Sequence, residues 1–187
     1  MNKSAARKHW LEQRNNLTVN DCLKLDDLLL LQFQKLDWSN VHVVASYYPL
    51  EKQNEPNTLL FTNYLKAVIP GITIAYPMVD TTILTMQFYA ETETLQQNQY
   101  GIMEPLPTRP IEIEQIDALL VPLIAFDQTG HRIGYGKGFY DKYFVNFPPN
   151  RPRIGISYFK PIANIQDTHE FDVPLTHCIT PWNSYEF

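Results

Sequence analysis

The amino-acid sequence predicts an α/β protein whose mostly parallel sheet carries helices on both faces. Segments with helical periodicity largely alternate with short β-branched segments along the 187 residues, an order typical of such a sheet. Residues 117–126 (DALLVPLIAF) have the length and apolar content of a strand buried on both faces. No linker interrupts the chain, so we expect one domain over residues 1–187.

The expected elements follow from periodicity and capping signals. Two helices come first, and the second begins near Asn20 and holds the leucines at 28–31. Asn57 or Thr58 caps a third helix. A fourth begins at Gly138 and ends before Pro148, with apolar residues at helical spacing. Strands are expected at 41–47, 72–76, 83–89, 117–126 and 153–158, of which the second and third are candidates for a hairpin.

A cluster of glycines follows the strand at 117–126. Four of the seven glycines lie within nine residues, at Gly130, Gly134, Gly136 and Gly138, and the stretch also contains Arg132 and Lys137. Glycine destabilises helices and strands, so the cluster indicates backbone shaped around a ligand. The order of strand, glycine loop and helix favours an anion, and a phosphate is the expected ligand. The alternative is a glycine-rich hairpin turn.

Two common glycine-loop motifs do not match this stretch. A Walker A loop ending at Gly136 and Lys137 requires glycine where the chain has His131, and serine or threonine where it has Gly138. A dinucleotide-binding fingerprint requires glycine at the position of Phe139. The sequence therefore supports neither a P-loop NTPase nor a Rossmann dehydrogenase.

Composition and charge narrow the class of protein further. The net charge of −5 and the pI near 5.5 argue against a nucleic-acid-binding surface. Cys22 and Cys178 are too few for a disulfide framework, and no Cys/His spacing resembles a zinc site. The N-terminus is charged and lacks the apolar core of a signal peptide, and no stretch could span a bilayer. We expect a cytoplasmic protein without a membrane or nucleic-acid partner.

Residues 121–141 (VPLIAFDQTGHRIGYGKGFYD) closely resemble the signature of 5-formyltetrahydrofolate cyclo-ligases, also called methenyltetrahydrofolate synthetases. Weaker similarities run from the first helix to the end of the chain. They include Tyr100–Pro105 (YGIMEP), which we expect to shape the backbone, and a segment with His169 and Asp172. The resemblance implies the three-layer α/β/α fold shared with ribose-phosphate isomerases and CoA transferases.

The resemblance also implies a nucleotide site on the glycine loop and the first helix. Lys3 and Arg7 lie four residues apart on one helix face, and Arg14 extends the stripe. From the residues alone a solvated face is the favoured reading, whereas in the family the Lys-x-x-x-Arg pair reaches the phosphates. The ATP-binding residues expected are Lys3, Arg7, Arg132, Ile133, Gly134, Tyr135, Gly136, Lys137, Gly138, Phe139 and Tyr140.

A folate site is implied next to the nucleotide. The family glutamate that corresponds to Glu55 lies there, and a carboxylate can accept hydrogen bonds from the amino and ring N–H groups of a reduced pterin. Without the resemblance, Glu55 could simply favour the start of the following helix. The substrate-binding residues expected are Tyr48, Glu55, Tyr135, Lys137, Phe139 and Tyr140.

Asp141 and Asp172 are the expected magnesium ligands. Magnesium on nucleotide phosphates keeps several waters and needs only one or two carboxylates from the protein. For Asp172 a turn cap is the equal alternative on the residues alone. Lys137, Arg132 and Tyr140 are the expected catalytic residues, and the alternative for Tyr140 is a core aromatic.

The activity implied is the ATP- and magnesium-dependent cyclisation of 5-formyltetrahydrofolate to 5,10-methenyltetrahydrofolate, with release of ADP and phosphate through a phosphorylated formyl intermediate. The partners expected are these small molecules, in a monomer or homodimer. Two alternatives stay open at this point. One is a sugar-phosphate isomerase or CoA-transferase-like enzyme of the same fold, and the other is a non-catalytic folate or nucleotide sensor.

Overall fold

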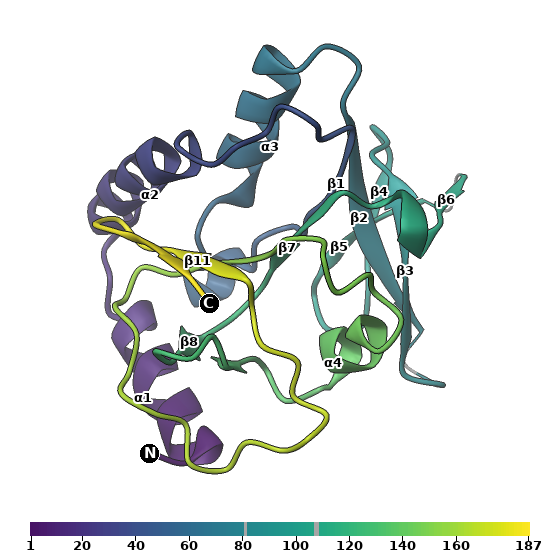
Figure 1. Cartoon of the computed structure of the whole chain (residues 1–187). Helices are drawn as coiled ribbons and strands as arrows, with labels where there is room; N and C mark the ends of the chain where they lie inside the picture. Colours follow the sequence, from purple (N-terminus) through teal and green to yellow (C-terminus); the bar gives the residue numbers. More distant parts are fainter. Residues whose placement is uncertain (81, 107–108) are drawn as a thin grey trace.

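The computed structural model describes residues 1–80, 82–106 and 109–187 and contains one large sheet flanked by helices (Figure 1). The helices are α1 Lys3–Asn15, α2 Val19–Phe33, α3 Thr58–Val68 and α4 Phe139–Phe144, with short 3-10 turns at Glu51–Gln53 and Ile113–Gln115. The strands of the large sheet are β1 Val43–Ala45, β2 Thr73–Asp80, β3 Thr85–Ala90, β6 Pro110–Ile111, β7 Ala118–Val121, β10 Arg153–Ile156, β11 His177–Ile179 and β12 Ser184–Glu186.

The large sheet has the order β12-β11-β10-β7-β1-β2-β3-β6 within the described residues. The neighbours from β11 to β2 are parallel, and β12, β3 and β6 are antiparallel additions at the edges. The predicted α/β class with a mostly parallel sheet is therefore confirmed. The predicted hairpin is confirmed as well, because β2 and β3 pair antiparallel from Ala75 opposite Ala90 to Asp80 opposite Thr85.

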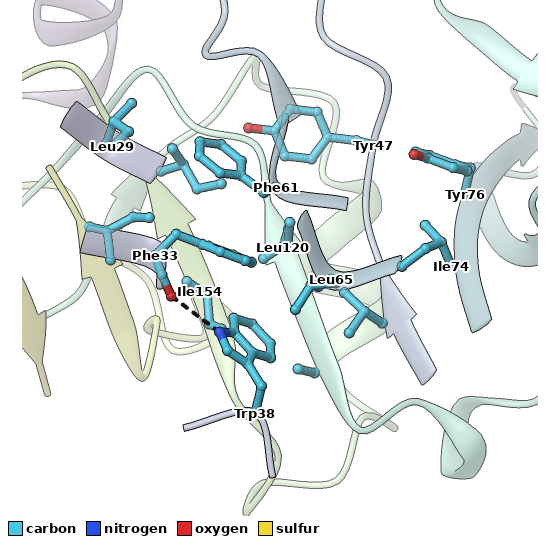
Figure 2. Close-up of a cluster of buried hydrophobic side chains, with 14 of the residues drawn as sticks. Leu29, Phe33, Trp38, Tyr47, Phe61, Leu65, Ile74, Tyr76, Leu120 and Ile154 are labelled. Carbon is cyan, nitrogen blue, oxygen red and sulfur yellow. Dashed lines mark hydrogen bonds between the residues drawn. The ribbon is translucent and has the colours of Figure 1, made fainter. Parts of the chain in front are cut away.

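Side chains alternate between the two faces of the sheet and build a hydrophobic core on each. On one face, Val44 and Leu120 pack with Phe33 of α2 and Phe61 of α3; Figure 2 shows this cluster, in which Trp38 Nε1 donates a hydrogen bond to Phe33 O at 3.1 Å. On the other face, residues that include Ala45 and Leu119 pack with α4. Helices therefore cover both faces, as predicted.

Helix starts agree with the sequence prediction, and α3 has one of the two predicted caps. The Asn57 side chain caps α3 by accepting a hydrogen bond from Leu59 N at 3.2 Å. A capping box between Thr18 and Asp21 places the first residue of α2 at Val19, next to the predicted start. α4 begins after Gly138, whose backbone is left-handed, and it is shorter than predicted.

The strand predicted at 117–126 is wrong in its second half. β7 ends at Val121, because Pro122 has no N–H to donate to a neighbouring strand. The chain then forms a separate two-stranded ladder, in which β8 Ala125–Phe126 pairs with β9 Arg132–Ile133. Gly130 lies in the turn between these strands, with φ +83° and its N–H bonded to Asp127 O at 3.2 Å. The hairpin-turn alternative thus describes Gly130, whereas Gly134–Gly138 form the loop that follows.

Several elements have no counterpart in the sequence prediction. These are β6, β11 and β12 of the large sheet and a second small ladder, β4 Leu95–Gln97 with β5 Met103–Pro105. Both cysteines are free thiols. Among the helices formed by the described residues, none is long and apolar enough to cross a membrane.

Candidate active site

A cavity of about 550 Å³ lies where the chain leaves β1 and β7, beside the second half of β2. Tyr47 and Tyr48 enter it from the segment after β1, Pro122 from the end of β7, and Pro77 and Val79 from β2. The loop after β9 closes one side of the cavity, and α1 also contributes residues. This is the edge at which open α/β sheets bind ligands.

All of the predicted site residues line this cavity. They are Lys3, Arg7, Tyr48, Glu55, Arg132, Ile133, Gly134, Tyr135, Gly136, Lys137, Gly138, Phe139, Tyr140, Asp141 and Asp172. Their shared location is a structural finding, and the role of each remains a prediction.

Arg7 joins α1 to the glycine loop. Its Nε donates a hydrogen bond to Gly134 O at 2.8 Å, and its guanidinium carbon lies 3.4 Å from the place a Cβ would occupy on Gly136. Gly136 has a φ of +84°, a conformation that side chains disfavour. The first helix and the loop, more than a hundred residues apart in the chain, therefore share one cationic wall.

Arg132 and Lys3 each hold one of the two predicted metal ligands. Arg132 Nη2 lies 2.6 Å from Asp141 Oδ1, and its Nη1 donates to Val173 O at 2.7 Å. Lys3 forms an ion pair with Asp172. Burial lowers the pKa of Arg132 and is opposed by Asp141. Burial also disfavours ionised Asp172, but hydrogen bonds from Lys3 and His169 outweigh it and leave the pKa of Asp172 below its ordinary value.

Lys137 is exposed at the mouth of the cavity. Its Nζ lies 5.0 Å from the ring centroid of Tyr100, which belongs to the turn between β4 and β5. No carboxylate in the described parts of the chain forms an ion pair with Lys137. Its ammonium group is therefore available to an anionic ligand.

Glu55 belongs to a buried hydrogen-bond chain that reaches Tyr135 of the glycine loop. Arg14, which is 2% exposed, donates from Nη2 to the Tyr135 hydroxyl, and that hydroxyl donates to Glu55 Oε1. Burial raises the pKa of Glu55 above its ordinary value, while the Arg14 charge acts in the opposite direction. The expectation that Arg14 extends an exposed cationic stripe is wrong, because its guanidinium points inward and also donates to Leu123 O and Gln53 O.

Tyr140 lines the cavity and also packs against a hydrophobic core cluster. Its hydroxyl is buried and has no hydrogen-bond partner among the residues that the structure describes, and burial raises its pKa. The ring also packs beside Phe144, with centroids 6.1 Å apart. A buried hydroxyl without a partner is costly, so this group favours a ligand that supplies one.

Sequence reasoning missed part of the lining. Tyr47, Gln53, Tyr100 and Glu104 also face the cavity, and the structure adds Tyr76, on which Tyr48 stacks with centroids 4.0 Å apart. Burial raises the pKa of Tyr48 to about 12. The sequence predicts only a backbone-shaping role for Tyr100–Pro105. A single Glu-Pro pair does not reveal that the carboxylate of Glu104 faces the cavity.

The fold and the cavity together define an α/β ligand-binding protein, whose cavity is lined by a cationic glycine loop and by the buried carboxylates of Glu55 and Glu104. The model of the 5-formyltetrahydrofolate cyclo-ligase family matches residues 1–181, and the chain belongs to this family. The predicted resemblance is thereby confirmed over nearly the whole chain.

Individual relatives and solved structures agree with this membership. The chain is 31% identical over 163 residues to a 5-formyltetrahydrofolate cyclo-ligase of Mycoplasma pneumoniae, covering 84% of this chain and 86% of that protein. The NMR structure of the Aquifex aeolicus 5,10-methenyltetrahydrofolate synthetase superposes with a TM-score of 0.83 at 27% identity, covering 100% of this chain and 93% of that one. The structure of the Mycoplasma pneumoniae 5,10-methenyltetrahydrofolate synthetase superposes with a TM-score of 0.72 at 28% identity, covering 96% of this chain and 98% of that one.

Proposed function

We propose that this chain converts 5-formyltetrahydrofolate and ATP into 5,10-methenyltetrahydrofolate, ADP and phosphate. Family membership supports this reaction. One observation carries the proposal: Lys3, Arg7 and the glycine loop line the same cavity as the buried carboxylate of Glu55.

The cationic wall suits the triphosphate. The cavity is lined by four cationic side chains, those of Lys3, Arg7, Arg132 and Lys137. Gly134, Gly136 and Gly138 expose backbone to the cavity because they carry no side chains. Lys137 lacks an anionic partner in the described structure, so it can follow the transferred phosphoryl group. Arg132 is already ordered by Asp141 and Val173 O and can stabilise charge without reorganising.

The tyrosines and Glu55 in the lining suit the pterin. Tyr47 and Tyr48 provide aromatic surface, and Tyr48 is held flat against Tyr76. Glu55 offers carboxylate oxygens to the N–H groups of the heterocycle. Tyr135 is fixed between Glu55 and Arg14, and Tyr140 has a hydroxyl that a ligand can satisfy.

The chemistry requires no protein nucleophile. The formyl oxygen attacks the γ-phosphorus of ATP, the bond to the ADP oxygen breaks, and an iminium phosphate forms. Nitrogen 10 of the folate then adds to the activated carbon and loses its proton, and departure of inorganic phosphate leaves the methenyl product. Lys137 and Arg132 neutralise the phosphoryl group in both steps, so positioning and charge stabilisation supply most of the rate.

Asp141 and Asp172 fit a magnesium ion in donor chemistry. Both are carboxylates on the phosphate side of the cavity, although each is paired with a cation of the protein. The described residues contain no group of three or more potential ligands, so ATP and water would have to supply the remaining ligands. Such an ion would neutralise phosphate charge during transfer.

An omission assay tests this function. The protein is mixed with 5-formyltetrahydrofolate, ATP and magnesium, and each is left out in turn while methenyl absorbance is recorded. We expect product only in the complete mixture. Turnover without ATP would instead indicate an isomerase- or transferase-like activity, and binding of both ligands without product would indicate a sensor.

A further inference from the structure

Glu104 lies in β5 and is 4% exposed, yet it lines the cavity. Its Oε1 accepts two hydrogen bonds, from Val79 N at 2.9 Å and from Asn98 Nδ2 at 2.8 Å. Its Oε2 receives none from the described residues, and no cation among them pairs with this carboxylate. A buried carboxylate is costly unless its oxygens are satisfied. Oε2 therefore retains acceptor capacity for a ligand.

The position of this carboxylate is fixed by the turn between β4 and β5. Asn98, which donates to Glu104, also accepts hydrogen bonds at Oδ1 from Tyr100 N at 2.9 Å and Ile102 N at 3.1 Å. Tyr100 and Ile102 line the cavity as well. The acceptor is thus held in place by backbone and amide contacts before any ligand arrives.

Glu55 differs from Glu104 in this respect. Its Oε1 accepts from the Tyr135 hydroxyl and its Oε2 from Leu50 N at 2.7 Å. Both oxygens of Glu55 already have protein donors, whereas one oxygen of Glu104 has none in the described structure. By this criterion Glu104 has the greater capacity for a donor from the ligand.

We propose that Glu104 is a second substrate-binding carboxylate, which accepts a hydrogen bond from the amino group at position 2 of the reduced pterin. This inference rests on the proposed function, because it takes the folate as the ligand. The amino group is a good donor, and Tyr100, Ile102, Val79 and Met86 line the same cavity and provide apolar surface for the ring. Specificity for a pterin that carries the 2-amino group follows, since an analogue without this donor would leave Glu104 unsatisfied.

The test compares two ligands on the parent and on Glu104→Gln. The ligands are 5-formyltetrahydrofolate and its analogue with methyl in place of the 2-amino group, and binding is measured by equilibrium dialysis without ATP. We expect Glu104→Gln to weaken binding of the natural folate roughly tenfold or more, and to change binding of the analogue far less. In turnover assays the KM for folate should rise while the KM for ATP stays constant.

A structural role for Glu104 predicts a different pattern. If Glu104 only anchors Val79 and Asn98, the substitution weakens the binding of both ligands by the same factor or leaves both affinities unchanged. Either result overturns the proposal. Glu93→Gln removes the same charge from an exposed residue upstream on the chain and should alter neither ligand. Glu104→Asp, which keeps the charge but withdraws it by one methylene, decides the question by the same ligand comparison if Glu104→Gln does not fold.

The two proposals fail separately. A parental chain that binds 5-formyltetrahydrofolate in dialysis but forms no methenyl product overturns the proposed reaction, while the ligand comparison still decides the role of Glu104. If the parental chain forms the product and Glu104→Gln weakens the binding of both ligands equally, only the inference about Glu104 is overturned.

Discussion

Lys137 carries the most accessible positive charge of the glycine loop, with its ammonium over Tyr100 and no carboxylate partner in the described structure. We predict that Lys137→Ala lowers turnover roughly a hundredfold to a thousandfold, because charge stabilisation of the transferred phosphoryl group is lost. Thermal unfolding should stay nearly unchanged, since the side chain is exposed and leaves no core cavity. Methenyl absorbance and a melting curve measure the two effects.

Lys142→Ala is the matched control for this prediction. Lys142 is also exposed and lies five residues further along the chain in α4, but it does not line the main cavity. Its replacement should leave turnover near the parental rate. Parental activity in Lys137→Ala, or an equal loss in both variants, would remove Lys137 from the phosphoryl-transfer step.

Gly136 and Gly134 allow a second comparison at the scale of single residues. Gly136 has φ +84°, whereas Gly134 has an ordinary φ, and a Cβ there meets nothing within 4 Å. We predict that Gly136→Ala lowers the free energy of unfolding by about 1–2 kcal/mol, and that Gly134→Ala changes it by less than about 0.5 kcal/mol. Urea denaturation measures both, and equal losses would show that backbone conformation is not the cause.

Single residues also show where sequence reasoning stops. Helical spacing placed Lys3, Arg7 and Arg14 on one stripe, and the structure brings the first two to the cavity. Arg14 is instead buried against Tyr135 and the carbonyls of Gln53 and Leu123. Spacing along a helix predicts which residues share a face, but it does not show which of them the following segments will cover.

At the scale of elements, sequence reasoning predicted the features that depend on neighbouring residues, but it missed strands that form through pairing with distant segments. The start of α2, the cap of α3 and the β2–β3 hairpin depend on residues close in sequence, and sequence reasoning predicted all three. The strand at 117–126 was overextended because its apolar residues continue past Pro122, where the chain leaves the sheet. The edge strands β11 and β12 are only three residues each, too short for periodicity to be recognised.

Asp26 of α2 joins three elements and supports a prediction about pH. Its Oδ1 accepts hydrogen bonds from Tyr158 OH at 2.7 Å and from Asn57 N at 3.1 Å, at the start of α3. Burial raises the pKa of Asp26 above its ordinary value of 3.8, although these hydrogen bonds oppose the shift. The stability that Asp26 contributes is therefore complete below pH 3.8 and decreases as the pH rises through its folded-state pKa.

Asp26→Asn keeps an oxygen for both donors and removes the charge. We predict that this variant gains stability relative to the parent as the pH rises from about 4 to 8, measured as the free energy of unfolding in urea at each pH. Asp27→Asn, the exposed neighbour on the same helix, should show no such trend. A constant difference between parent and Asp26→Asn across this pH range would contradict the assignment.

At the scale of the whole molecule, the cavity exists only in the folded chain. Its walls come from α1, the segment after β1, the β2–β3 hairpin, the β4–β5 turn and the loop after β9. The signature at 121–141 located one wall from sequence alone, and the resemblance added Lys3, Arg7 and Glu55. The β4–β5 wall, which holds Tyr100 and Glu104, was not predicted, because its place depends on pairing between residues that have no distinctive pattern.

Because the ligands bind only to this assembled state, they should stabilise the protein. A ligand at a hundred times its dissociation constant adds about 2.7 kcal/mol, which corresponds to a rise of roughly 5–10 °C in the melting temperature of a protein of this size. We predict such a rise with either 5-formyltetrahydrofolate or a magnesium complex of a non-hydrolysable ATP analogue. Arg7→Ala should reduce the nucleotide effect, because a charged contact to phosphate is lost, and should leave the folate effect intact.

Lys8→Ala is the control, since Lys8 is the exposed neighbour of Arg7 on α1 and does not line the cavity. Both ligands should stabilise this variant as they do the parent. If Arg7→Ala lowered the two ligand effects equally, Arg7 would act by holding the loop at Gly134 and so supporting the whole cavity. If it lowered neither, the first helix would have no part in binding the phosphates, and its contact with the glycine loop would serve the fold alone.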